Sequence, residues 1–279
     1  MELHSTFLES DPPNFEPDGK VGLLATISEE GFPHLTLITA MRAPDIGHLT
    51  FGQFSEGRGK ENAEARKNCG FLLMSLSRKL WRGKALWTGK SIAGPENDIY
   101  NAKPMWRYNS YFGIHTVHYL DLVGTTRPVK LPMGKILAGA IKAALFKGRY
   151  RSSGDRGAMN PWTRRFIGKM GNLKFLSYID DDGFPRIIPA LSATVSDSSI
   201  IYIPGTEFPR DLSRIPDRTT VSLFTMSLDM EDVLVRGTFR RTGAGGTIRV
   251  EWVYNSMPPV AKQIYPPVRS NVKVEQFDL

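Results

Sequence analysis

Short apolar runs separated by polar turn residues recur along the whole chain. In the first half they cover residues 22–27, 34–41, 48–54 and 70–75, and a further run starts near Gly83. Runs this short and this regularly spaced, with hairpin signals between them, are typical of antiparallel barrels. The pattern therefore predicts a mainly β protein.

Three segments break this pattern and predict short helices. Residues 59–68 are good helix formers, and the segment ends at Gly70. Residues 134–147 place their apolar side chains along one stripe, which is an amphipathic pattern. A third helix is expected from Asn160 to Gly171, because asparagine caps a helix and the proline after it suits the first turn.

The chain also contains an internal repeat. Gly31 and Gly183 occupy the same place in the hairpin sequences Ile-Ser-Glu-Glu-Gly-Phe-Pro and Ile-Asp-Asp-Asp-Gly-Phe-Pro, an offset of 183 − 31 = 152 residues. The same register aligns the two Met-Ser-Leu sequences at 74–76 and 226–228, and it aligns Arg58 with Arg210. The apolar runs of the second half follow suit at 173–179, 186–195, 199–204, 220–226 and from Val233. A repeat of this length predicts two copies of one barrel.

Composition narrows the class of protein. Apolar residues make up 41% of the 279 positions and charged residues 23%, which excludes a disordered chain, a collagen and a coiled coil. A single cysteine, Cys69, excludes an intramolecular disulfide and a cysteine-rich metal site. Residues 1–18 hold five carboxylates and no lysine or arginine, unlike a signal or transit peptide. We expect a cytoplasmic protein.

The net charge of +8 is concentrated in one segment. Nine basic residues lie between positions 135 and 169: Lys135, Lys142, Lys147, Arg149, Arg151, Arg156, Arg164, Arg165 and Lys169. Asp155 is the only acid there, so the segment carries 9 − 1 = 8 positive charges, which is the whole excess. Because the rest of the chain is close to neutral, we expect no nucleic-acid partner.

The basic segment leaves three interpretations open. Its cationic amphipathic helix, within residues 134–151, could contact an anionic membrane surface or polyanion. The favoured alternative is a helix that caps a barrel with its apolar stripe and keeps its lysines in water. The third is that its charge concentrates an anionic substrate or cofactor near the site.

The order of these motifs resembles a known family. A strand, an acidic-Gly-x-Pro hairpin and two more strands lead to Ser-x-x-Arg-x-Lys at a helix start, and Leu-Leu-Met-Ser-Leu follows. This resembles the FMN-binding split barrel of the pyridoxamine 5′-phosphate oxidase superfamily over residues 20–125, and more weakly over 172–255. The resemblance implies two tandem six-stranded antiparallel split β-barrels packed as a pseudo-dimer. We expect barrels at 1–130 and 172–279 and a basic helical connector at 131–171.

The resemblance also implies where a flavin would bind. Ser55, Arg58 and Lys60 match the place where the family holds the FMN phosphate, and a helix N-terminus with a forked and a point cation suits a phosphate dianion. The alternative is that Arg58 and Lys60 are solvated charges beside two glutamates. Three further positions match the family's contacts to the flavin ring, although they could equally face water or the core: Thr39, Gln53 and Phe54.

The second copy departs from this pattern. Lys60 corresponds to Leu212 and Ser55 to Glu207, although Arg58 is kept as Arg210. A carboxylate repels a phosphate and a leucine donates no hydrogen bond. We therefore expect phosphate binding in the first copy alone.

The resemblance implies FMN as the cofactor, with a deazaflavin or haem less favoured. The function expected is an oxidoreductase acting on an unidentified small molecule. Vitamin B6 oxidation is not expected, because residues 268–279 lack the family's C-terminal histidine. The main alternative is a carrier that binds the cofactor without turnover, and a purely structural protein is the third.

Other features give weaker signals. The family's barrels commonly pair, so a homodimer is also considered. The aromatic-rich segment 105–113 is interpreted either as a lid over the flavin or as a helix packed between the barrels. No metal site is predicted, because His115 and His118 would point to opposite faces of a strand.

Overall fold

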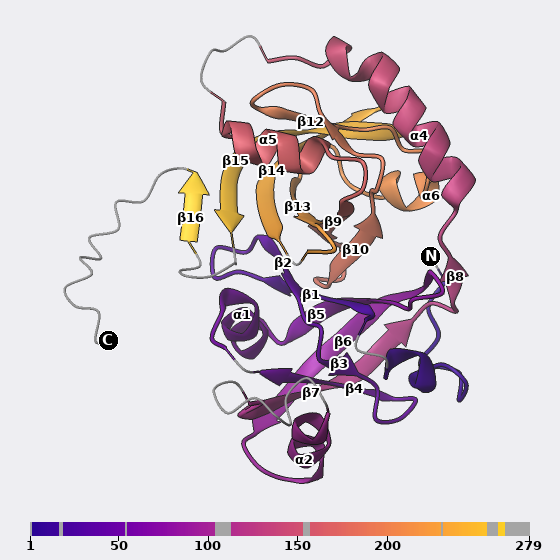
Figure 1. Cartoon of the computed structure of the whole chain (residues 1–279), viewed down its shortest axis with the longest axis vertical. Helices are drawn as coiled ribbons and strands as arrows, with labels where there is room; N and C mark the ends of the chain where they lie inside the picture. The colour runs from indigo at the N-terminus through magenta and orange to yellow at the C-terminus, as the bar shows by residue number, and fades with distance from the viewer. Residues whose placement is uncertain are drawn as a thin grey trace, which may run out of the picture.

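The computed structural model describes residues 2–16, 19–53, 55–103, 113–152, 157–229, 231–255 and 262–265, the side chains of 262–264 excepted. The described residues form two antiparallel sheets, one from each half of the chain. In Figure 1 the first sheet is drawn in indigo and magenta below the second, which is drawn in orange and yellow. Two predictions fall on residues outside the described ones: the flavin-ring contact of Phe54, and the interpretation of the aromatic-rich segment over residues 105–112.

The first sheet contains eight described strands: β1 (Val21–Ile27), β2 (Pro33–Leu37), β3 (Met41–Arg42), β4 (His48–Gln53), β5 (Asn68–Met74), β6 (Lys79–Ser91), β7 (Thr116–Thr125) and β8 (Val129–Lys130). Their order is β2-β1-β5-β6-β7-β4-β3, and β8 pairs with β6.

The second sheet has the same order, β10-β9-β13-β14-β15-β12-β11, and its last described strand, β16, pairs with β15. Its strands are β9 (Leu173–Ile179), β10 (Pro185–Pro189), β11 (Thr194–Val195), β12 (Ile200–Ile203), β13 (Thr220–Met226), β14 (Asp232–Thr242), β15 (Gly245–Asn255) and β16 (Lys262–Tyr265). The predicted pair of antiparallel barrels is confirmed.

Each sheet has more strands than the six predicted, partly because one predicted strand per copy is broken by a turn. The run 34–41 divides into β2 and β3, and the Met41 N–H donates to the Ile38 carbonyl at the break. In the second copy the Ala193 N–H donates to the Ala190 carbonyl in the same way. The two hairpin glycines behave as predicted: φ is 82° at Gly31 and 78° at Gly183, the region that favours glycine.

The described α-helices are α1 (Arg58–Arg66), α2 (Pro95–Ala102), α4 (Met133–Phe146), α5 (Pro161–Gly168) and α6 (Pro209–Leu212). Asn160 caps α5 as predicted, since its Oδ1 accepts a hydrogen bond from the Thr163 N–H at 2.8 Å. Two 3₁₀ turns lie at Pro12–Phe15 and Lys147–Arg149. None of the described helices has the length and apolar character that a membrane crossing requires.

Separate apolar clusters fill the two barrels and the interface between them. One fills each barrel, and Cys69 lies in the first of them as the small core residue predicted. The third cluster joins the barrels, with Leu35 and Leu72 from the first and Phe175 and Phe224 from the second. The barrels therefore share a continuous apolar interface.

The contacts across this interface repeat with the same offset as the sequence. The Arg236 guanidinium lies 4.2 Å from the Phe32 ring centroid, and the matching pair, the Lys84 ammonium and the Phe184 ring, is separated by 5.4 Å. Each contact joins a strand of one barrel to the hairpin of the other. The arrangement is a pseudo-dimer within one chain.

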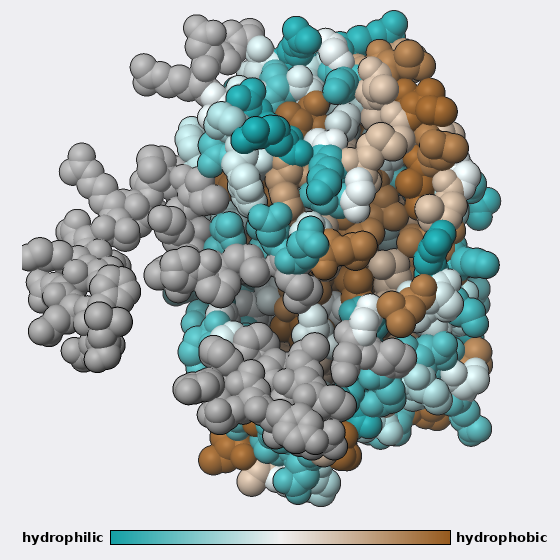
Figure 2. Space-filling view, viewed as in Figure 1, coloured by the Kyte–Doolittle hydropathy of each residue, from teal (hydrophilic) through white to brown (hydrophobic). Residues whose placement is uncertain are grey.

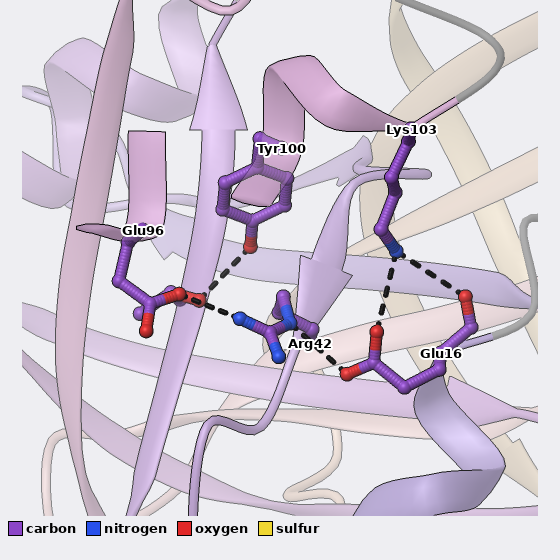
Figure 3. A network of polar contacts seen from close by, with 6 residues as sticks. Glu16, Arg42, Glu96, Tyr100 and Lys103 are labelled. Atoms are coloured by element: carbon purple, nitrogen blue, oxygen red, sulfur yellow. Dashed lines mark hydrogen bonds and ion pairs between the residues drawn. The ribbon is translucent and has the colours of Figure 1, made fainter. Parts of the chain in front are cut away.

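A polar network closes the far end of the first barrel, and Figure 3 shows its labelled members: Glu16, Arg42, Glu96, Tyr100 and Lys103. Arg42 on β3 donates to Glu16 at 3.0 Å and to Glu96 of α2 at 2.6 Å. The buried Tyr100 hydroxyl bonds with Thr50 of β4 at 2.9 Å. Burial alone would lower the pKa of Arg42, but its hydrogen bond to Glu16 and the two carboxylate charges raise it. The network fixes α2 against β3 and β4.

Candidate functional site

The predicted phosphate site lies at the N-terminus of α1, directly after β4. The N-cap residue of α1 is Gly57, which has no side chain to accept a hydrogen bond, so no capping side chain uses the first N–H groups of the helix. Gly59 packs against β2 so closely that a Cβ there would lie 2.2 Å from Thr36 Oγ1. That hydroxyl is buried and has no hydrogen-bond partner in the described structure. Glycine at this position lets the first turn of α1 approach β2.

Lys60 is a buried cation rather than a solvated one. It is 8% exposed, and its Nζ donates to the Ser55 carbonyl at 2.5 Å. Burial lowers the pKa of Lys60, and the charges of Glu56 and Glu61 oppose this effect. No carboxylate of the described residues forms an ion pair with Lys60. A buried ammonium without a counter-ion is poised to interact with an anion.

Arg58 points across to the second barrel. Its guanidinium lies 5.4 Å from the ring centroid of Tyr254 on β15. The Tyr254 ring also meets His34 of β2 at 5.6 Å and stacks on Trp252 at 5.3 Å. Side chains of both barrels thus converge beside the start of α1.

Arg236 of β14 brings a second cation to the same place. Its guanidinium lies between two rings, 4.2 Å from the centroid of Phe32 and 4.7 Å from that of Trp252. Neither Arg58 nor Arg236 forms an ion pair with another described residue. We call Arg58, Arg236, His34 and Tyr254 the interbarrel cluster.

The charges of this cluster act on its histidine. Burial, followed by the charges of Arg58 and Arg236, lowers the pKa of His34 to about 4. Burial also lowers the pKa of Arg236, which the charge of Glu30 opposes. His34 is therefore neutral near neutral pH, and the two arginines give the cluster a net positive charge.

Gln53, at the end of β4, is held by a second histidine. His118 of β7 is fully buried, and its Nε2 lies 2.5 Å from Gln53 Oε1. Trp87 Nε1 donates to His118 Nδ1 at 3.1 Å, so the imidazole proton is on Nε2 and is donated to Gln53. Burial is the main reason that the pKa of His118 falls to about 4. This arrangement orients the Gln53 amide with its nitrogen left for another acceptor.

The counterpart of the α1 site in the second barrel is closed by ion pairs. Asp211 stands where the first copy has Gly59, and it pairs with the buried Arg82 at 2.8 Å. Arg186 stands where the first copy has His34, and it pairs with Asp180 at 2.8 Å. Arg82 and Arg186 are thus paired within the chain, whereas Arg210, the counterpart of Arg58, is exposed and forms no ion pair with another described residue.

A small pocket lies among these ion pairs, lined by Arg82, Tyr178, Asp180, Arg186, Ile187, Ile188, Asp211 and Arg214. It is therefore at the counterpart site and not at α1. The residues equivalent to Ser55 and Lys60 have different roles in the second barrel. Glu207, equivalent to Ser55, is buried and accepts a hydrogen bond from the Ser192 N–H at 2.6 Å. Leu212, equivalent to Lys60, packs in the barrel core.

Helix α4 covers the part of the second barrel that corresponds to residue 54, one of the predicted flavin-ring positions. Gly139 of α4 packs onto Ser192 and Thr206, where a Cβ would lie within 3 Å of both side chains. Lys142 donates to the Pro204 carbonyl at 2.8 Å. Thr206 is the counterpart of residue 54 in the first copy.

The predicted site residues have different surroundings. Arg58, Lys60 and Ser55 are brought together at α1, and Gln53 lies at the end of the neighbouring strand. Thr39 lies in the turn between β2 and β3, not on a strand as the sequence pattern predicts. Among the described residues, no group of three or more His, Cys, Asp or Glu side chains is placed to hold a metal ion.

Sequence reasoning missed the partners of these residues. His34, Arg236 and Tyr254 come from strands that carry no motif, and they meet Arg58 because the barrels pack face to face. The repeat offset relates equivalent residues of the two copies, but no sequence signal shows which strands meet between the barrels.

Comparisons with known proteins return similar structures but no sequence relative. No family model matches the chain, and no curated protein matches it. An FMN-binding protein from Syntrophomonas wolfei is 12% identical, covering 39% of this chain and 77% of its own, with a TM-score of 0.33. A pyridoxamine 5′-phosphate oxidase-related, FMN-binding protein from Nostoc punctiforme is 14% identical, covering 40% and 74%, with a TM-score of 0.27.

A third similar structure is an F420 reductase, 13% identical over 38% of this chain and 88% of its own, with a TM-score of 0.31. Each of the three matches covers less than half of this two-barrel chain.

Proposed function

We propose that the chain is an FMN-binding flavoprotein that transfers electrons between the flavin and a small molecule. The observation that supports this most strongly is the contrast between the two copies. At α1 the buried Lys60 and the two arginines of the interbarrel cluster form no ion pair with a carboxylate among the described residues. At the counterpart site, by contrast, the buried Arg82 pairs with Asp211, and Arg186 pairs with Asp180. Cations without an ion pair beside a helix N-terminus favour a phosphate.

The residues of the first barrel fit such a group. Arg58, Lys60 and the first N–H groups of α1 would hold the phosphate, and the buried, unpartnered Thr36 hydroxyl lies beside that turn. The Gln53 amide nitrogen, oriented by His118, would donate to an acceptor on the ring. A bound flavin would supply the redox chemistry, and the chain would supply binding and orientation.

The second barrel contributes a wall rather than a second site. Trp252 and Tyr254 of β15 present stacked rings, 5.3 Å apart, toward the first barrel. Planar aromatic faces of this kind suit a planar ligand. Asp211 stands at the position of Gly59 and pairs with Arg82, so a carboxylate of the chain itself occupies the place where the first copy would accept a phosphate.

The test is a titration of purified protein with FMN, followed by its visible spectrum. We expect one flavin per chain. Arg58→Gln is expected to weaken binding roughly tenfold, the effect of losing one charge-assisted contact. Arg210→Gln is the matched control, because Arg210 is the equivalent exposed residue of the second copy and is expected to leave binding unchanged. Two equivalent sites, or equal losses in both variants, would contradict the proposal.

Turnover is tested separately from binding. The flavin-loaded protein is mixed with NADH or NADPH without oxygen. Bleaching of the flavin absorption supports an oxidoreductase. A spectrum that stays oxidised with either donor favours a carrier for flavin, deazaflavin or haem, and the position of the absorption bands distinguishes these cofactors.

A further inference from the structure

Helix α4 presents four of its larger apolar side chains to solvent. Leu137, Ile141 and Leu145 are 60%, 56% and 71% exposed, and Met133 is 49% exposed. Their spacing of four residues places them along one face of the helix. Figure 2 shows hydrophobic surface along the edge of the molecule where Figure 1 places α4.

The opposite face of α4 already has a partner. Gly139 and Ala143 are buried against the second barrel, and Lys142 is tied to the Pro204 carbonyl. The docked face is thus formed by these small residues together with the half-buried Ile136, which packs against the apolar cluster between the barrels. A helix that is apolar on both faces is expected to bury both. The outer stripe, defined as Met133, Leu137, Ile141 and Leu145, therefore calls for a partner outside the chain.

The charge around the stripe indicates what that partner is. Residues 122–154 contain no aspartate or glutamate, and their basic residues are Arg127, Lys130, Lys135, Lys142, Lys147, Arg149 and Arg151. Apart from Lys142, all of these side chains are exposed. A second copy of the chain docked on the stripe would bring like charges together. An anionic surface complements them.

The length of the helix decides how it would meet a bilayer. Fourteen residues of α-helix span roughly 21 Å, short of the ~30 Å hydrocarbon core. An apolar stripe flanked by lysine and arginine is the pattern of a helix that lies in the membrane interface. We propose that α4 docks the protein on an anionic lipid bilayer, with the outer stripe among the acyl chains and the flanking basic residues on the headgroups.

The experiment is co-sedimentation of the full chain with vesicles of equal parts phosphatidylglycerol and phosphatidylcholine, and with phosphatidylcholine alone. We expect binding to the anionic vesicles that weakens as salt is raised. The triple variant Leu137→Gln, Ile141→Gln, Leu145→Gln is expected to lose binding roughly tenfold or more. Because these side chains are exposed, its thermal unfolding temperature is expected to match that of the parent chain.

Matched control variants distinguish binding through the outer stripe from nonspecific adsorption to the vesicles. Leu76→Gln with Leu228→Gln removes two leucines that are 70% and 80% exposed at other hairpins, and should leave binding intact. For charge, Lys135→Gln with Arg149→Gln should weaken binding. Arg66→Gln with Lys67→Gln removes two exposed charges at the C-terminal end of α1 and should leave vesicle binding unchanged.

Three outcomes would overturn the proposal. The first is failure of the parent chain to bind anionic vesicles. The second is equal vesicle binding by the stripe variant and the parent. The third is a homodimer, seen by sedimentation velocity, that the stripe variant dissociates, because the stripe would then be an interface between copies.

Discussion

Lowering the pH is expected to destabilise the fold through two buried histidines. The pKa of His34 and that of His118 both fall from 6.5 to about 4 on folding. The unfolded chain therefore binds more protons than the folded chain between these values. The stabilising contribution is fully present above about pH 6.5 and is lost as the pH falls toward about 4.

The size of the effect follows from these pKa values. Between about pH 7 and about pH 5, each histidine would reduce the free energy of unfolding by about 2 kcal/mol, and the pair by about 4 kcal/mol. At His118 there is also a geometric reason. Protonation of Nδ1 would remove the acceptor that Trp87 Nε1 uses and bring two donors together.

The assay is urea unfolding of the parent chain and of His118→Gln at both pH values. Because glutamine does not titrate, the variant is expected to lose about 2 kcal/mol less than the parent over this interval. Gln53→Met is the control: it removes the acceptor of the Nε2 proton but keeps the buried imidazole, so the parent's pH dependence should persist. Identical pH dependence in His118→Gln and the parent would refute the assignment.

Two further predictions concern the α1 side of the first barrel. Burial raises the pKa of the Cys69 thiol to about 12. Near neutral pH, iodoacetamide should therefore alkylate Cys69 in the urea-unfolded chain but not in the native chain. Rapid labelling of the native chain would contradict the burial of this thiol. Gly59→Ala should cost roughly 1–3 kcal/mol through the clash with Thr36, with partial rescue by adding Thr36→Ala, as measured by thermal unfolding. Gly134→Ala, in open space within α4, is its control and should be neutral or stabilising.

Most of the fold could be predicted because the same sequence pattern occurs in both halves of the chain. The hairpin at Gly31 recurs at Gly183, and both glycines adopt the positive φ that the sequence predicts. Thr39 was placed on a strand because the apolar run continues through it, whereas the hydrogen bond from Met41 to Ile38 makes a turn there. Local pattern could not distinguish the two.

The candidate site was only half predictable. Arg58 and Lys60 stand out by their position after a strand, but the contact from Arg58 to Tyr254 joins residues nearly two hundred positions apart and has no local signal. In the sequence, His118 was considered only as a metal ligand together with His115, and their spacing spoke against a metal site. Its role in orienting Gln53 depends on the pairing of β4 with β7. The sequence identified the apolar stripe of α4 but left open whether it caps a barrel or contacts a membrane, because periodicity does not tell which face of a helix is docked.

The central claim is that cations at the start of α1 bind a phosphate that their counterparts in the second barrel cannot bind. Isothermal titration of the parent chain and of the Arg58→Gln, Lys60→Met variant with FMN and with riboflavin tests it most directly, since the two ligands differ by the phosphate. The account predicts that the parent prefers FMN by roughly a hundredfold, from two charge-assisted contacts, and that the variant has largely lost this preference. Equal affinity of the parent for both ligands, or an FMN preference that survives in the variant, would contradict it.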